Sequence, residues 1–170
     1  MVIPLKPTRG GFLRPFGCGW FIQEFLSGKG PGVSPAIDPS IGAPQADIFH
    51  YYKESLRIAT AYDRATRMET RRARKEKRSI DPGNINKLAN RYLTRLPYKA
   101  QGCRYHSFVV YFSMLQKLNW VEPTGYEEPS AFQGNYPLGP PRRYYRLTDA
   151  GMSASDAAWA NPHDALYSGG

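Results

Sequence analysis

The chain has 170 residues, enough for one domain of ordinary size with its own hydrophobic core and terminal extensions, but short for two full domains. Its 23 Lys and Arg exceed its 14 Asp and Glu, so the net charge is +9 at pH 7. This balance favours anionic partners such as nucleic acid or an acidic protein surface. No window approaches the roughly 18 apolar residues that cross a bilayer, so we expect a soluble protein with no membrane partner.

The cysteines argue against a metal or disulfide framework. Cys18 and Cys103 are far apart and lie in no CxxC or Cys/His spacing. A reducing, intracellular setting fits this pattern. Prolines and glycines break every apolar run at the N-terminus, and no small-residue cleavage signal follows, so we expect no signal peptide. The expected location is cytoplasmic, or nucleoid-associated if the partner is the chromosome.

Residues 1–46 read as an extended, Pro/Gly-rich arm that also carries an aromatic cluster. Phe21, Phe25 and Trp20 share one face of a short helix in this interpretation. That face covers either the chain's own core or a protein partner, and the two alternatives have similar weight. A solvated tail does not usually carry such a cluster.

Residues 47–79 contain no proline or glycine and predict one long helix with Asp47 as its N-cap. Its first half is amphipathic, whereas its second half is a basic run that reads as either a phosphate-binding surface or a merely solvated face. The helix is also the better candidate for a homodimer contact. The basic run consists of Arg71, Arg72, Arg74, Lys75, Lys77 and Arg78.

Shorter elements follow. Asp81 as a cap and Pro82 at the first helical position predict a helix over 82–96, and a further helix is expected over 104–119. A strand then begins at Val121, residues 124–141 form a long loop, and "RRYYRL" returns the chain as a second strand. Thr148 is expected to N-cap the next segment, with Leu147 turned inward. An alanine-rich helix then runs to about Ala160, and Trp159 and Tyr167 are expected to pack locally.

The order helix, helix, turn, helix, strand, loop, strand resembles a winged helix-turn-helix domain, over about residues 82–152. "MLQKLNWVEP" resembles the end of a recognition helix that leads into the first wing strand, with Asn119 where the family often has glycine. "RRYYRLTDAGM" resembles the second wing strand and following helix start of PadR-like and MarR-like regulators. The resemblance implies a DNA-binding protein whose wing presents Arg142 and Arg143 to the phosphate backbone or a minor groove.

The expected recognition helix departs from the family pattern, because "FVVYFSML" is apolar nearly all round and predicts burial on more than one side. Its groove-facing positions would include Phe108, Val109 and Phe112, which are unsuited to hydrogen-bonded base readout. Either the protein binds nucleic acid mainly through phosphate contacts, or the apolar face of this domain docks another subunit. The candidate contacts, besides the basic run and the wing arginines, are Arg104, His106, Ser107, Ser113, Gln116 and Lys117.

Enzymatic interpretations find little support. His50, His106 and His163 are scattered without metal-ligand spacing, and "SGKGPG" lacks the ending of a phosphate-binding loop. We therefore expect no catalytic residue, metal or cofactor.

The expected fold class is mainly α with a small β-hairpin wing: a winged helix-turn-helix with a long preceding helix and an extended N-terminal arm. The expected domains are an arm at 1–46, a basic helix plus winged helix at 47–152, and a tail at 153–170. The expected function is non-enzymatic DNA binding as a transcription regulator or architectural factor, with RNA as an alternative ligand. The alternative function is a structural subunit of a larger, nucleic-acid-containing or purely protein complex.

Overall fold

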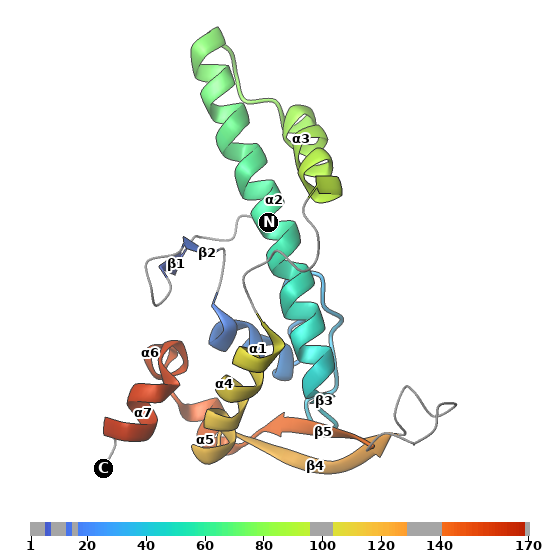
Figure 1. Ribbon diagram of the computed structural model, residues 1–170, viewed down its shortest axis with the longest axis vertical. Helices are drawn as coiled ribbons and strands as arrows, with labels where there is room; N and C mark the ends of the chain where they lie inside the picture. Colours follow the sequence, from blue (N-terminus) through green and yellow to red (C-terminus); the bar gives the residue numbers. More distant parts are fainter. Residues whose placement is uncertain (1–5, 8–12, 15–16, 96–103, 129–140, 169–170) are drawn as a thin grey trace. The chain divides into compact units, whose positions relative to one another are not determined.

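The computed structural model describes residues 6–7, 13–14, 17–95, 104–128 and 141–168. The described part is mainly helical and contains a small three-stranded antiparallel sheet (Figure 1), so the coarse fold class is confirmed. Contacts between Cα atoms divide the chain into two units. The helical unit comprises residues 1–17 and 53–103, and the sheet unit comprises residues 18–52 and 104–170. The helical unit therefore interrupts the sheet unit in sequence.

The helical unit contains a helical hairpin. The long helix α2 (Gln45–Glu76) passes into this unit at Lys53, and α3 (Pro82–Arg95) lies beside its C-terminal half (Figure 1). A separate antiparallel pair, β1 (Lys6–Pro7) and β2 (Leu13–Arg14), belongs to the same unit.

The boundaries of α2 differ from the expected 47–79. The helix begins at Gln45, directly after a short strand, so Asp47 lies in its first turn and is not the N-cap. At the other end, Lys77 adopts a left-handed conformation with φ of 55°. The N–H of Arg78 then donates to the carbonyl of Ala73 at 3.0 Å, which closes the helix at Glu76.

Small side chains let the two helices of the hairpin approach closely. Ala61, Ala65 and Ala73 lie at steps of four or eight along α2 and are fully or almost fully buried. On α3, Leu88 and Ala89 are buried against Ala65. Partly buried Met68, Ile85 and Tyr92 surround this cluster.

A buried carboxylate holds the turn end of the hairpin. Glu69 occupies the same α2 stripe as the alanines, and its side chain is 0% exposed. Arg78 binds it with both terminal nitrogens at 2.8 Å, and the backbone N–H of Asp81 donates to it at 2.9 Å. Such a bidentate, charge-assisted arrangement satisfies the buried charge and fixes the turn between the helices.

The start of α3 agrees with its sequence signals. The carboxylate of Asp81 accepts the N–H of Gly83 at 2.8 Å, and Pro82 is the first helical residue. The predicted helix over 82–96 is thus found as far as Arg95. The expected stop at Pro97 and the turn up to Cys103 lie outside the described residues.

The buried carboxylate predicts an acid-sensitive hairpin. Hydrogen bonds from Arg78 and from the Asp81 backbone lower the pKa of Glu69 from 4.5 to about 2. Between these values the unfolded chain binds more protons than the folded one, so this stabilisation is complete above pH 4.5 and is lost as the pH falls toward about 2. Glu69→Gln should therefore lower the melting temperature near neutral pH, and the difference from wild type should shrink in acid.

Circular dichroism melts across this pH range check the prediction. The half-buried Glu54, which forms an i,i+3 pair with Arg57, provides the matched control Glu54→Gln, for which only a small change is expected. A melting difference for Glu69→Gln that is the same at every pH would contradict the assignment of the stabilisation to the Glu69 charge.

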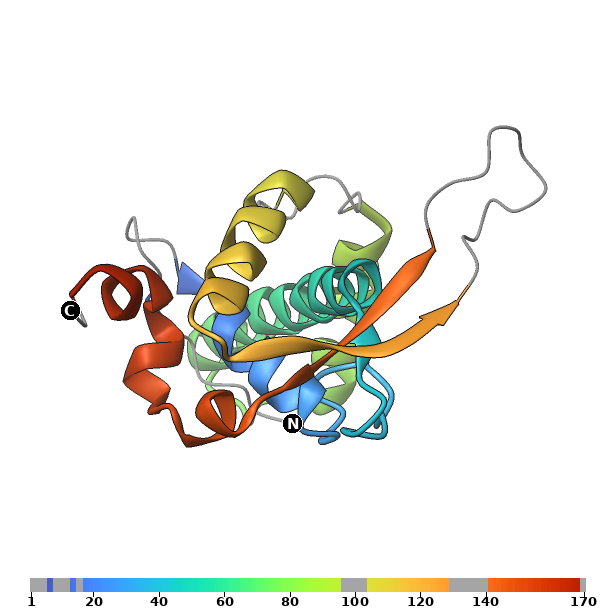
Figure 2. The ribbon, with the colours of Figure 1, turned by 90° about the horizontal axis from the view of Figure 1, so that it is seen from below.

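The sheet unit has a strand order of β3–β5–β4, all antiparallel. The strands are β3 (Ala43–Pro44), β4 (Val121–Glu128) and β5 (Arg142–Leu147). Figure 2 shows both strands of the β4–β5 hairpin over their full length. Val121 pairs with Leu147 and Glu128 with Arg142, so β4 continues well past the loop start expected at 124. A register shift between Pro123 and Glu127 accommodates Gly125, whose φ is 83°.

Three helical segments of the sheet unit supply most of its aromatic core. They are α1 (Cys18–Leu26), the first two turns of α2, and α4 (Tyr105–Lys117). The ring of Phe21 stacks 5.3 Å from that of Tyr52, and Phe112 meets Tyr145 edge-on at 5.1 Å. Residues from Cys18 to Leu26 therefore pack on the chain's own core, which confirms one of the two alternatives for the aromatic cluster, and α1 is the short helix expected there.

The junction around Thr148 links α4, the sheet and the C-terminal segment. Asn119 has φ of 59°, the conformation that glycine would favour at this place. Thr148 caps α5 (Asp149–Ser153) by accepting the N–H of Gly151 at 3.0 Å, as predicted. The indole N–H of Trp159 donates to the Gly151 carbonyl at 2.9 Å, and its ring lies 5.0 Å from that of Trp120 at a tilt of 38°.

The C-terminal segment forms α5, α6 (Asp156–Ala160) and α7 (Pro162–Ser168) in place of one alanine-rich helix. Ser155 caps α6, and this cap explains the break within the alanine-rich segment. Trp159 packs in the core as expected. Tyr167 packs locally as expected, because its ring lies 4.6 Å from that of His163 one turn earlier, but the side chain is 70% exposed.

Gly151 should tolerate no larger residue. A Cβ atom at this position would lie 2.2 Å from the carbonyl oxygen of Trp120, which is backbone and cannot rotate away. We expect Gly151→Ala to destabilise the protein by about 1–3 kcal/mol, in the range of overpacked sites. Urea unfolding measures this difference. Gly17→Ala is the matched control, because nothing lies within 4 Å of a Cβ there. Equal stabilities for the two variants would contradict the packing described.

Candidate nucleic-acid interface

The strongest concentration of positive charge lies on the helical hairpin. Residues 53–95 contain thirteen Lys and Arg against five Asp and Glu, a net charge of +8. The sheet unit contains six against nine, a net charge of −3. Residues 53–95 thus hold 13 of the 23 Lys and Arg of the chain, and their net charge of +8 is close to the +9 of the whole chain.

A basic stripe runs along α2 on the side away from its buried alanines. Arg64, Arg67, Arg71 and Arg74 follow one another at steps of three, four and three, so they share one helix face with the neighbouring Lys75. At 1.5 Å per residue this stripe is about 16 Å long. Its spacing suits contacts with successive phosphates.

Most cations of the hairpin are available to an anionic ligand. Arg57 pairs with Glu54, and Arg67 pairs with Asp63 at 2.8 Å. The cations of the hairpin that form no ion pair with another described residue are Arg64, Arg71, Arg72, Arg74, Lys75, Lys77, Lys87, Arg91 and Arg95, and all are exposed.

Arg78 has a different position from the other members of the predicted basic run. Its guanidinium is held by Glu69 and Glu76, and these interactions raise its pKa. Its side chain is 32% exposed. Arg78 therefore serves first to close the hairpin, whereas the other five residues of the run are exposed and form no ion pair with another described residue.

The polar candidates on α4 do not share one face: His106, Ser113 and Lys117 lie on the same exposed side, whereas Ser107 and Gln116, nine residues apart, project from opposite sides. Val109 and Val110 are 36% and 44% exposed on the side of His106, so the predicted burial of the helix on more than one side is wrong there. The buried residues are Phe108 and Phe112, with Leu115 one turn further, so the two phenylalanines do not face a groove. Arg104, His106, Ser107, Gln116 and Lys117 are exposed, and Ser113 is half-buried.

The wing arginines are engaged by carboxylates of the opposite strand. Arg142 pairs with Glu128 at 3.2 Å and Arg143 with Glu127 at 3.6 Å, as the register of β4 and β5 requires. Arg142 also binds Asp47 on α2. A phosphate group at this end of the β4–β5 hairpin would have to compete with these acids. The loop beyond it, which includes Phe132 and Tyr136, lies outside the described residues.

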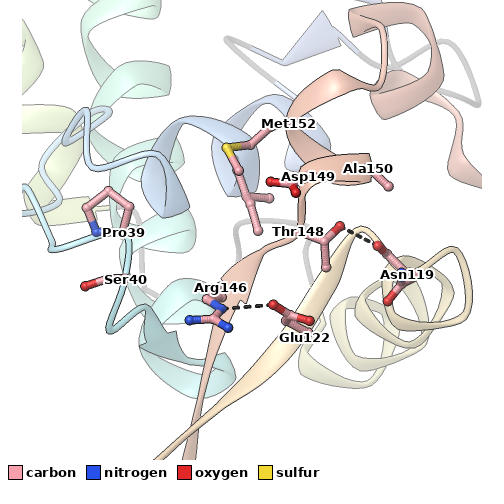
Figure 3. A pocket seen from close by; sticks show the side chains of 10 residues that line it. Pro39, Ser40, Asn119, Glu122, Arg146, Thr148, Asp149, Ala150 and Met152 are labelled. Carbon is pink, nitrogen blue, oxygen red and sulfur yellow. Dashed lines mark hydrogen bonds and ion pairs between the residues drawn. The ribbon is translucent and has the colours of Figure 1, made fainter.

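A cavity of about 570 Å³ lies beside the base of the β4–β5 hairpin (Figure 3). Arg146 and Glu122 form an ion pair across its floor at 2.9 Å, and Thr148 donates to the carbonyl of Asn119. Asp149 is the other carboxylate in the lining. This set has neither a nucleophile with a base nor a paired-carboxylate geometry, and no chemistry follows from it.

Other kinds of site are not found among the described residues. They contain no group of three or more His, Cys, Asp or Glu side chains that could hold a metal ion. Cys18 lies at the start of α1, whereas Cys103 falls outside the described residues. In the described part of the chain no helix has both the length and the apolar character that crossing a membrane requires.

Part of the basic surface is not predicted from consecutive charges in the sequence. Arg64 and Lys87 stand outside the run at 71–78, so a search for consecutive charges passes over them. Helical spacing is the signal that finds them. Arg64 lies one turn before Arg67 and two turns before Arg71, so the three share one helix face, and Lys87 lies one turn before Arg91.

Comparisons with known proteins add no relative: no family model, no curated protein and no solved structure matches the chain.

Proposed function

We propose that this protein binds nucleic acid without catalysis, through phosphate contacts made by the helical hairpin of α2 and α3. The observation that carries the proposal is the net charge of +8 on residues 53–95, with most of those cations exposed and outside any ion pair among the described residues. Clustered Lys and Arg on one element are the electrostatic footprint of phosphate binding.

Duplex DNA is the ligand that we favour. The sheet unit has a three-helix core formed by α1, the start of α2 and α4, followed by the β4–β5 hairpin. This arrangement supports a winged helix-turn-helix in which the hairpin of α2 and α3 is an insertion, so that α3 is not one of its core helices. A role as a transcription regulator or architectural factor in the cytoplasm or nucleoid follows from this proposal.

The distribution of exposed cations fits contacts with phosphates better than it fits recognition of base edges. The outward face of α4 mixes Gln116 and His106 with Val109 and Val110, and the cations that the described part of this segment contributes are Arg104 and Lys117. The wing arginines are paired with acids. Binding with little dependence on sequence is therefore the expected behaviour.

A second candidate function is a protein-contact subunit of a larger complex. The exposed Val109 and Val110 on α4, together with the negative charge of the sheet unit, favour it. In that case the basic hairpin keeps the protein in solution or meets an acidic partner, and duplex binding is absent at low salt.

The salt dependence of binding tests the proposal. If four to eight hairpin cations contact phosphates, the logarithm of the affinity for random-sequence duplex DNA should fall against the logarithm of the salt concentration with a slope of about −4 to −7. Fluorescence anisotropy measures this slope. Absent binding at low salt, or a slope near zero, would contradict the proposal. A parallel titration with duplex RNA identifies the preferred nucleic acid.

Matched double variants locate the contacts. Arg71→Gln/Arg74→Gln and Arg142→Gln/Arg143→Gln remove the same charge, one pair from the helical hairpin and the other from the wing. The first should reduce the magnitude of the salt slope by about 2 and weaken binding about equally for every sequence. The second should have a smaller effect, because Glu127 and Glu128 already offset both arginines. A larger loss for the wing variant would place the interface on the sheet unit.

A further inference from the structure

A groove between α2 and α3 gathers cations from both helices. It has a volume of about 320 Å³, and Arg72 on α2 lines it together with Lys87 and Arg91 on α3. Lys87 and Arg91 are four residues apart and so lie one above the other on the same face of α3. The apolar part of the lining is Leu88, which is buried.

The acidic group of the groove is already neutralised. Glu76 lines it, but its carboxylate is bound by Nε of Arg78, which also reaches the buried Glu69. Arg72, Lys87 and Arg91 form no ion pair with another described residue. The groove as a whole therefore carries a positive charge that lacks a counterion of its own.

The geometry points to a phosphate-binding site in this groove, an inference that rests on the proposed function and deepens it. Two guanidinium groups and one ammonium group approach a single cavity from two helices, and forked guanidinium donors match the oxygens of a phosphate group. The phosphate belongs either to the backbone of a bound nucleic acid or to the end of a free nucleotide. The groove differs in this respect from the outer stripe of α2, whose cations lie on the side of the helix opposite its buried alanines.

The closed hairpin is a condition for this site. Arg72 comes from one helix and Lys87 and Arg91 from the other, so their separation is set by the packing of Ala65 on Ala89 and by the Glu69–Arg78 pair. A pre-formed arrangement binds an anion without the cost of gathering like charges at the moment of binding.

Two triple variants distinguish a defined phosphate-binding site in the groove from a general electrostatic attraction by the whole basic surface. Arg72→Gln/Lys87→Gln/Arg91→Gln empties the groove of its free cations, whereas Arg64→Gln/Arg71→Gln/Arg74→Gln removes the same charge from the outer stripe. All six residues are exposed, and circular dichroism melts check that both proteins stay folded. The probes are a short random-sequence DNA duplex and ATP, each titrated into the full chain at low salt.

We expect the groove variant to lose at least tenfold more affinity for the phosphate ligand than the stripe variant. Loss of duplex binding without competition by ATP assigns the site to a backbone phosphate, and displacement of the duplex by ATP assigns it to a terminal phosphate; both results support the inference. Equal losses in the two variants would overturn it and leave the proposed function in place. Failure of the wild-type protein to bind either probe would overturn both.

The single exchanges Lys87→Gln and Lys75→Gln provide a second comparison, with less risk to folding. Both lysines are exposed, and each exchange removes one charge, but only Lys87 lines the groove. A greater loss for Lys87→Gln supports the site, and an equal or smaller loss contradicts it.

Discussion

The buried carboxylate of Glu69 is the constraint on which the helical unit depends. A charge with no exposed surface is stable only when it is paired and hydrogen-bonded, and Glu69 meets this condition through Arg78 and the backbone of Asp81. Because Arg78 and Asp81 flank the turn, the same contacts fix where α2 ends and α3 begins. The packing of Ala65 on Leu88 and Ala89 then sets the approach of the two helices, and most of the remaining cations lie either on the outer stripe of α2 or around the groove between α2 and α3.

Charge and architecture are divided between the two units. The sheet unit has the aromatic core, the antiparallel sheet and a net charge of −3, whereas residues 53–95 carry +8. Acids on β4 meet the arginines of β5, so the β4–β5 hairpin gains cross-strand stability at the expense of free positive charge. In the proposed function, the sheet unit is the scaffold and the inserted helical hairpin is the binding surface.

Local signals in the sequence predicted much of the fold. Asp81-Pro82 marked the start of α3, Thr148 the cap of α5, and the alternation in "RRYYRL" the strand β5. Such local signals do not predict which residues pair over long distances in the sequence. Nothing next to Glu69 in sequence distinguishes it from a solvated glutamate, although its spacing of four from Ala65 and Ala73 places it on the buried stripe. Likewise, Asp47 looked like a cap because its pairing with Arg142, 95 residues later, leaves no local trace.

Lysine reactivity in the presence of duplex DNA tests most directly whether the helical hairpin is the binding surface. Lys75, Lys77 and Lys87 lie on the hairpin, whereas Lys29 and Lys117 belong to the sheet unit, and all five can be followed by acetylation and mass spectrometry. Binding through the hairpin predicts that DNA protects the first three and leaves Lys29 and Lys117 as reactive as in the free protein. Protection of Lys117 with unchanged reactivity of the hairpin lysines would contradict it.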